Sequence, residues 1–278
     1  MSAPLLLYRT PGGAVLGCEG GFFGLIETWD GLVNHPRLAD HLRGVAARGR
    51  RMETLAEPLL APVGGQEVWA AGVTYERSRQ ARAGESHQTG GSAFYDRVYE
   101  AERPELFLKA AGWRVKGPGE PVRVRRDARW SVPEPELALY VNERGEIVGW
   151  TIGNDVSSRD IEAENPLYLP QAKIYDGSCA LGPAVLVAEG PLPPQTAIEL
   201  RVLRAGAVAF EGGTTLARMR RTPEDLVRYL FRETSFPLGC VLLTGTGIVP
   251  PGDFTLQVGD VVEIRVPPIG TLRNPVSF

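Results

Sequence analysis

The stretch VPEPELALYVNERGEIVGWTIGNDVSSRD (132–160) holds two segments of strand composition on either side of the turn sequence NERGE. Side chains two residues apart on a strand leave the same face, so Glu134 and Glu136 point one way and the leucines after them point the other way. A short turn predicts an antiparallel hairpin in which the numbers of facing residues sum to roughly 287–290. This register places Asn154 or Asp155 beside Glu134, so three carboxylates meet at one end of the hairpin.

Three acids in an apolar surrounding carry an electrostatic cost. Two unit charges about 4 Å apart repel by about 4 kcal/mol at an effective dielectric constant of about 20. The spacing alone leaves two interpretations open, a solvated strand end with surface glutamates or a site that binds a cation. Hard oxygen ligands with positions left for water and substrate favour Mg²⁺, with Mn²⁺ or Ca²⁺ as alternatives.

The chain after residue 106 consists mostly of strand-like segments separated by proline and glycine turns. These segments are FLKAA, VRV, ELALYV, IVGWTIGNDV, AVLVA, AIELRVLRAG, VLLTGTG and VVEIRV. One clear helix is expected after Thr222, with Pro223 at its first position and Glu224 and Asp225 in its first turn. The pattern predicts a β-rich α+β fold with many pairings between distant segments.

The chain is expected to divide near a proline- and glycine-rich linker, APVGGQ (61–66). Residues 1–62 form the smaller part, with short strands and one helix over roughly 36–50. Residues 67–278 form the larger part and begin with the strand VWAAGVTY. We expect the long polar segment 76–104 to cross the body of the protein as a partly mobile, lid-like excursion.

The composition excludes several classes of protein. The net charge of −3 over 278 residues argues against a nucleic-acid-binding protein, which usually has a basic face. No apolar run is long enough to span a bilayer, and the start lacks the basic-then-apolar order of a signal peptide. The three cysteines are far apart and suggest neither a disulfide framework nor a zinc site. We therefore expect a soluble cytoplasmic protein.

Lysine is rare in this chain, which otherwise uses arginine for its positive charge. The only lysines are Lys109, Lys116 and Lys173. A lysine can lose its proton, which arginine cannot, so each is either an ordinary surface lysine or a candidate acid/base group. Lys173 lies in ENPLYLPQAKIYDGSCALGP (164–183), which is expected to be an irregular loop. The turn LLTGTGIVPPGD (242–253) offers backbone amides that could bind a carboxylate.

Motifs of other catalytic sites are missing from the sequence. It contains no G-x-S-x-G, no P-loop, no G-x-G-x-x-G after a strand and no H-E-x-x-H. His35, His41 and His87 are too scattered to predict a metal cluster.

Four motifs together resemble the fumarylacetoacetate hydrolase superfamily: VPEPELALYV, GWTIGNDVSSRDIE, ENPLYLPQAKIYDGSCALGP and the late turn LLTGTG. The resemblance covers roughly residues 68–278. It implies a β-rich mixed-sheet roll preceded by a small N-terminal α+β unit, and Mg²⁺ bound by an E-x-E pair and an aspartate on the next strand. The matching positions are Glu134, Glu136 and Asp155 for the metal, Lys173 for the active-site lysine, and Phe107 to Lys109 for an F-x-K strand.

The segment TYERSRQA (74–81) departs from the pattern of the C–C hydrolases in this superfamily. Those enzymes carry N-Y-x-x-H-A-x-E, in which the His and Glu activate water. Ser78 stands at the His position and Ala81 at the Glu position, so that water activation is in doubt here. The T-Y-x-x-S-R form, with PELFLK and ENPLYLPQAK, resembles the branch typified by 2-keto-3-deoxy-D-arabinonate dehydratase. By that resemblance Glu105 joins Lys173 as a candidate acid/base residue.

The resemblance implies a Mg²⁺-dependent lyase that dehydrates a 2-keto-3-deoxy sugar acid through a metal-bound enolate. Lys173 would remove the C3 proton, and Glu105 or a water would protonate the departing C4 hydroxyl. An acylpyruvate-type hydrolase, an oxaloacetate-type decarboxylase and a metal-dependent small-molecule-binding protein stay open as alternatives. We expect a homodimer or homotetramer. The residues expected to contact the substrate are Lys109, Tyr75, Ser78, Arg79, Asp176 and Thr246.

Overall fold

The computed structural model describes residues 3–79 and 97–278. The first strands are β1 (Leu6–Thr10), β2 (Gly13–Cys18), β3 (Gly21–Gly24), β4 (Arg51–Met52), β5 (Glu67–Gly72), β6 (Glu105–Ala111), β7 (Val122–Arg123), β8 (Ser131–Val132) and β9 (Pro135–Val141). The later strands are β10 (Ile147–Asp155), β11 (Ser157–Ser158), β12 (Cys179–Val187), β13 (Ala197–Arg204), β14 (Ala207–Thr215), β15 (Cys240–Leu243), β16 (Val261–Val266) and β17 (Gly270–Ser277). The helices are α1 (Trp29–Val33), α2 (Leu38–Arg48), α5 (Arg159–Glu164), α6 (Leu169–Lys173) and α7 (Pro223–Leu230), with short 3₁₀ turns η2 (Gly112–Arg114), η3 (Pro166–Tyr168) and η4 (Leu216–Arg218).

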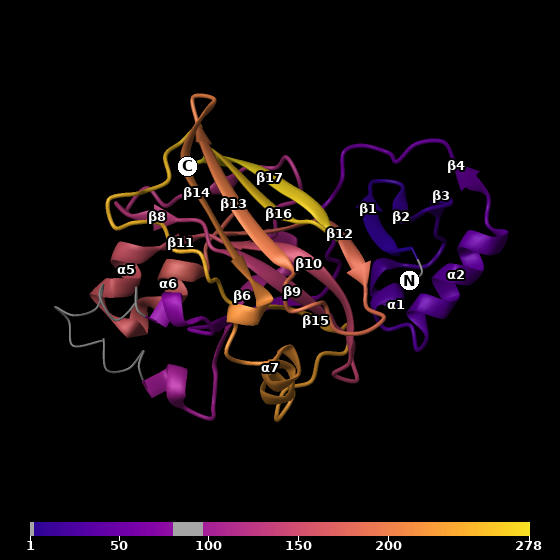
Figure 1. The fold of residues 1–278 in the computed structure, drawn as a ribbon, viewed down its shortest axis with the longest axis horizontal. Coiled ribbons are helices and arrows are strands. Elements are labelled where there is room, and N and C mark those ends of the chain that lie inside the picture. Colours follow the sequence, from indigo (N-terminus) through magenta and orange to yellow (C-terminus); the bar gives the residue numbers. More distant parts are fainter. Residues whose placement is uncertain (1–2, 80–96) are drawn as a thin grey trace.

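Two sheets dominate the architecture (Figure 1). The larger sheet has ten strands in the order β4-β3-β2-β1-β12-β10-β9-β15-β5-β6. It is mixed, because β15 runs parallel to β5 and antiparallel to β9. The smaller sheet has five strands in the order β14-β13-β16-β17-β7. The expected β-rich mixed-sheet fold is therefore confirmed.

The hairpin predicted from residues 132–160 forms the centre of the large sheet. β9 and β10 pair antiparallel, with Gly153 opposite Glu136 and Asn154 opposite Pro135. The numbers of these facing residues sum to 289, inside the predicted range. The Asp155 N–H donates to the carbonyl oxygen of Glu134 at 3.0 Å, which confirms that these two residues lie side by side.

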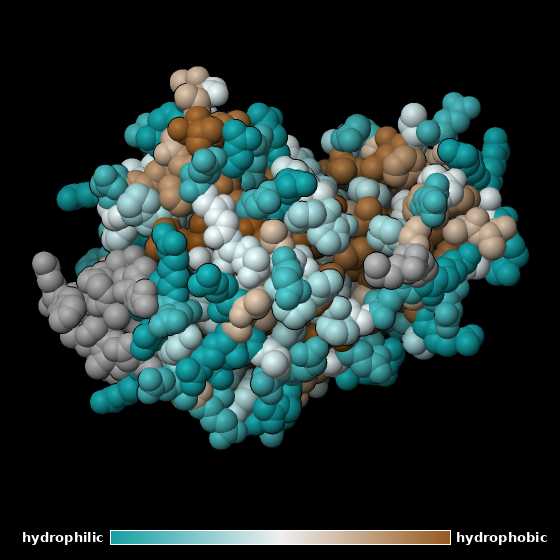
Figure 2. Space-filling view, viewed as in Figure 1, coloured by the Kyte–Doolittle hydropathy of each residue, from teal (hydrophilic) through white to brown (hydrophobic). Residues whose placement is uncertain are grey.

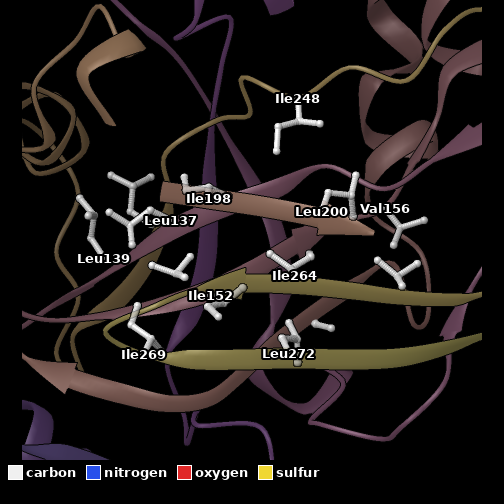
Figure 3. Close-up of a cluster of buried hydrophobic side chains, with 14 of the residues drawn as sticks. Leu137, Leu139, Ile152, Val156, Ile198, Leu200, Ile248, Ile264, Ile269 and Leu272 are labelled. Carbon is white, nitrogen blue, oxygen red and sulfur yellow. The ribbon is translucent and has the colours of Figure 1, made fainter. Parts of the chain in front are cut away.

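All seven residues of β9 are buried, because layers of the protein cover both faces of this strand. Leu137 and Leu139 belong to the hydrophobic core shared with the small sheet. Figure 3 shows this core, where Ile264 and Leu272 of the small sheet face the hairpin. On the other face, Ala138 and Tyr140 belong to the core that reaches the N-terminal residues. The hairpin is thus held from both sides.

The N-terminal residues join the large sheet without a break. β1 pairs antiparallel with β12, with Leu6 opposite Leu186. In Figure 1 the indigo N-terminal strands and α2 lie to one side of the roll. The division at 61–66 stays a prediction, and the two parts share a continuous sheet across it.

The capping prediction for the late helix is confirmed. α7 begins at Pro223, and the hydroxyl of Thr222 accepts a hydrogen bond from the backbone N–H of Asp225. The irregular loop expected over 164–183 is wrong in part, because it contains η3 and α6 and β12 already begins at Cys179. Pro166 and Pro170 stand at the start of η3 and α6, where a missing N–H costs nothing.

Two long strands, β14 and β17, have no counterpart in the sequence-based expectation. The β14 sequence AVAFEGGTT contains two glycines, and the β17 sequence GTLRNPVS contains a proline and a glycine. Both compositions are weak for strands, and pairing with β13 and β16 decides them. Residues 80–96 of the expected lid, with Ala81, Arg82 and His87, lie outside the described residues. Among the described residues, no helix is long and apolar enough to cross a membrane.

Shortening Leu139 to alanine tests the central position of the hairpin. Leu139 is fully buried in the main core, so Leu139→Ala should lower the free energy of unfolding by about 2–5 kcal/mol. The control Val258→Ala removes methyl groups from a side chain that is 50% exposed and should change stability by less than about 0.5 kcal/mol. Urea denaturation measures both, and equal small effects would contradict this placement of β9.

Candidate active site

Three buried carboxylates meet at the open end of the central hairpin. Glu134 precedes β9, Glu136 is the second residue of β9, and Asp155 is the last residue of β10. Each is less than 5% exposed. One ligand oxygen from each lies within 4.8 Å of the others, which is close enough for a single ion to bind all three. The structure therefore brings together the trio that the spacing predicted.

The ammonium of Lys173 lies in the middle of this acidic group. Its Nζ donates to Glu134 Oε2 at 2.7 Å, to Asp155 Oδ2 at 3.0 Å and to Ser157 Oγ at 2.5 Å. The lysine is 2% exposed and is the last residue of α6. The short helix thus places a positive charge where the carboxylates converge.

Two further cations hold the acids from outside. Lys109 on β6 forms an ion pair with Asp155 Oδ1 at 2.5 Å, and its Nζ also donates to the carbonyl oxygens of Val156 and Lys173. The ammonium therefore makes two hydrogen bonds and one ion pair, all with groups of the protein. Arg159 on α5 donates to Glu134 Oε1 at 2.8 Å. A contact between Lys109 and substrate stays a prediction, and the geometry gives this lysine the task of fixing Asp155.

Glu136 is the acid whose negative charge is least compensated. The backbone N–H of Gly245 donates to its Oε2 at 2.5 Å, and the described residues supply no ion pair to this carboxylate. Burial, and then the charges of Asp155 and Glu134, hold the pKa of Glu136 well above its usual range. A divalent cation would relieve this repulsion, and three carboxylates are the hard oxygen ligands that Mg²⁺ prefers. The residues present therefore fit a metal ion of that kind.

A small cavity of about 20 Å³ lies beside the carboxylates. Besides the three carboxylates and Lys173, its lining includes the predicted residues Glu105, Ser78 and Thr246. The Ser78 hydroxyl donates to the carbonyl oxygen of Tyr75 at 2.7 Å, which keeps the serine at the cavity wall. The volume holds about one water molecule, so a substrate can enter only when surrounding side chains move.

The other predicted contacts lie farther from the carboxylates. Tyr75 lines a separate cavity of about 940 Å³, although its buried ring is near enough to Glu136 for the two to interact electrostatically. Arg79 lies 3.5 Å from Glu76 and stacks on Tyr99. The side chain of Asp176 is 68% exposed and lies 3.4 Å from Arg114. Neither Arg79 nor Asp176 lines the small cavity, and their contact with substrate stays a prediction.

The sequence-based reasoning missed three buried residues of this site. Arg159 and Glu162 face the cavity from α5, one helical turn apart, and Ser157 accepts from Lys173. The signal was present in SSRDIE, which directly follows Asp155. A charged residue so close to a buried strand end is forced to lie near that end, whichever way the helix turns.

Comparison with known proteins gives the site a context. The sequence pattern described as fumarylacetoacetate (FAA) hydrolase C-terminal matches residues 68–277. The 2-dehydro-3-deoxy-D-arabinonate dehydratase of Saccharolobus solfataricus is 46% identical over 218 residues, covering 78% of this chain and 73% of the relative. The probable 2-keto-3-deoxyxylonate dehydratase of Haloferax volcanii is 48% identical over 217 residues, covering 78% and 74%.

A similar fold occurs in a solved structure titled 2-keto-3-deoxy-D-arabinonate dehydratase complexed with magnesium and 2,5-dioxopentanoate. It has a TM-score of 0.83 and 35% sequence identity to this chain. The match covers 99% of this chain and 98% of the other.

Replacing Glu136 with glutamine, which cannot titrate, should change how the free energy of unfolding of the metal-free protein depends on pH. Its raised pKa means that the folded chain holds this proton more tightly than the unfolded chain does. The contribution of Glu136 to stability therefore falls as pH rises above about 4.5. We expect Glu136→Gln to lose less stability than the wild type between about pH 4.5 and 7.

Urea denaturation in EDTA at several pH values measures this difference. Glu143→Gln, at a half-exposed side chain on the turn, is the matched control and should follow the wild type. Parallel curves for all three proteins would show that burial does not raise the pKa of Glu136.

Proposed function

Because this chain belongs to the fumarylacetoacetate hydrolase family, we propose that it is a Mg²⁺-dependent lyase that removes water from a 2-keto-3-deoxy sugar acid. The substrate class is a 2-keto-3-deoxypentonate, the class named for both dehydratase relatives. The observation that carries the proposal is the lysine among three carboxylates placed to hold one metal ion, beside a serine in place of a water-activating histidine.

The ligand named for the similar solved structure agrees with this reaction. A 2-keto-3-deoxypentonate that loses one water has the composition of 2,5-dioxopentanoate, the compound named in that title. The C3–H bond breaks, its electron pair forms the C3–C4 double bond, and the C4 hydroxyl leaves as water. Tautomerisation then moves two hydrogens from C5 and its oxygen to C3 and C4, which leaves the C5 aldehyde.

Glu134, Glu136 and Asp155 would hold the Mg²⁺ ion. When bound, the ion supplies positive charge that stabilises the negative charge developing on the ketone oxygen during C3 deprotonation. Arg159 and Lys109 keep Glu134 and Asp155 in place through the contacts described above.

We assign Lys173 as the base that takes the C3 proton. Without a metal its ammonium is held by Glu134, Asp155 and Ser157. A dication held by these carboxylates would replace the ammonium as their positive partner and would favour the neutral amine. The amine would accept the C3 proton, and Glu105 on the cavity wall would donate a proton to the departing hydroxyl.

The C–C hydrolase and decarboxylase alternatives require different help from the protein. Hydrolysis needs a base that activates water, and Ser78 has no basic side chain to offer. We propose the dehydratase over these alternatives and over a non-catalytic binding protein. We further propose a homo-oligomer, and a cytoplasmic location as the composition predicts.

A substrate panel tests the reaction class. Purified protein with Mg²⁺ should release water from a 2-keto-3-deoxypentonate without C–C cleavage, and EDTA should abolish the turnover. The product is measured by trapping its aldehyde and by mass spectrometry. Cleavage of an acylpyruvate, or decarboxylation of oxaloacetate, at a higher rate than dehydration would overturn the proposal. Binding without turnover would favour the binding protein.

Replacing Lys173 tests the base. Lys173→Met keeps the length of the side chain and removes the amine, so kcat should fall by about 10²–10⁴-fold. Mg²⁺ binding, followed by calorimetry, should persist because the three carboxylates remain. Lys116→Met is the matched control, since Lys116 does not line the cavity, and should keep normal turnover. Normal kcat in the Lys173 variant would refute the assignment.

A further inference from the structure

β14 (Ala207–Thr215) ends the five-stranded sheet (Figure 1). It pairs with β13 along one edge, from Arg204 opposite Ala207 to Ala197 opposite Thr215. No hydrogen bond of the described part of the chain satisfies the outward amides and carbonyls on its other edge. β14 is therefore a nine-residue open edge.

Open edges of this length are templates for pairing with another chain, and proteins usually blunt them with lysine, proline or a covering segment. The β14 sequence AVAFEGGTT has no lysine and no proline, and its single charge is Glu211. A register shift lies between Val208 and Phe210, where the strand bulges. From Phe210 to Thr215 the pairing with β13 is regular, so this half presents a straight edge.

The solvent face of the same sheet is unsuited to docking. Across its strands, Glu199 pairs with Arg265 at 2.8 Å and Glu263 pairs with Arg273 at 3.0 Å. Exposed ion pairs of this kind keep a face hydrated. By contrast, Figure 2 shows an apolar group near the tip of the β13–β14 hairpin, at the end of the open edge. Any partner of this sheet therefore meets its edge and not its face.

Neither the space around Gly213 nor its backbone conformation requires a glycine at this position. A Cβ added there would meet only the carbonyl oxygen of Ile198 at 3.7 Å, an ordinary contact, and its φ lies outside the left-handed region. Neighbouring Gly212 differs, because its Cβ would come within 2.8 Å of Ile248. A glycine within a strand often marks a bulge, a tight bend or the close approach of a ligand or another backbone, and the pairing with β13 shows no bulge at Gly213.

We propose that β14 pairs antiparallel with β14 of a second copy of this chain, across a twofold axis at Gly213. An antiparallel pair of identical strands is self-complementary, so one open edge serves both copies. In this register Glu211 faces Thr215 of the partner subunit, and like charges do not meet. In such a dimer the two five-stranded sheets would join into one continuous sheet. The inference rests on the proposed homo-oligomeric state and not on the proposed reaction.

The interface reaches the neighbourhood of the candidate active site. Gly213, Thr214 and Thr215 line the cavity of about 940 Å³, and Tyr75 lines the same cavity. Tyr75 in turn lies close to Glu136. A second copy along β14 would therefore lie next to residues that line the larger cavity.

A charge swap at Thr215 tests both the surface and the register. Thr215→Glu places an acid opposite Glu211 of the partner subunit twice, and Thr215→Lys places a base there twice. We expect the first variant to raise the dissociation constant of the dimer on the order of tenfold and the second to lower it. Analytical ultracentrifugation measures both, and circular dichroism checks that each variant is folded. A monomeric wild type, or equal dissociation constants for all three proteins, would overturn the proposal.

Disulfide cross-linking is a second test, and it can trap the dimer even if the substitution weakens it. In a Cys18→Ser background, Gly213→Cys should form a disulfide with its copy under mild oxidation, because residues facing each other across the axis are adjacent. The remaining cysteines, Cys179 and Cys240, are buried. Thr271→Cys, exposed on the same sheet away from β14, is the control and should stay unlinked. No cross-link at 213, or an equal one at 271, means that another surface forms the oligomer, and the dehydration assay is unaffected by either result.

Discussion

The repulsion among three carboxylates buried at one end of a hairpin is the constraint around which this protein is arranged. Buried charges are costly unless they are paired and hydrogen-bonded. Lys173, Lys109 and Arg159 supply the pairing, each from a different element, and the Gly245 amide supplies a hydrogen bond to Glu136. The raised pKa of Glu136 shows where compensation is incomplete. A divalent cation would complete it, so the imbalance that weakens the metal-free protein would favour binding of an ion.

The rest of the fold makes such a concentration of charge tolerable. The hairpin that carries the acids lies at the centre of a ten-stranded sheet with hydrophobic cores on both sides. Leu137 and Leu139 hold one face, and Ala138 and Tyr140 hold the other. Apolar burial of this extent fixes the strand, so the acids cannot separate to relieve their repulsion. Preorganised charge is what a site needs if it is to stabilise a developing negative charge.

The two lysines of the site have different roles. The rarity of lysine in the sequence could not distinguish these roles. Lys109 makes two hydrogen bonds to backbone carbonyl oxygens and an ion pair with Asp155, so it holds Asp155 in place. Lys173 donates to two of the three carboxylates, so a cation bound there would compete with it for these partners. Rarity singled out both residues, and only their hydrogen-bond partners separate a positioning lysine from a candidate base.

Local rules of chain geometry determined the hairpin from the sequence alone. The period of two on a strand and the length of the turn bring Glu134, Glu136 and Asp155 together, and capping chemistry sets the start of α7 at Pro223. The tertiary structure alone decided which distant groups reach the acids. Lys109 lies on β6, four positions along the sheet order from β10, which carries Asp155. Long-range strand pairing, which no local sequence pattern encodes, brings the two residues together. The strands β14 and β17 likewise exist because partners pair with them, against weak propensities of their own.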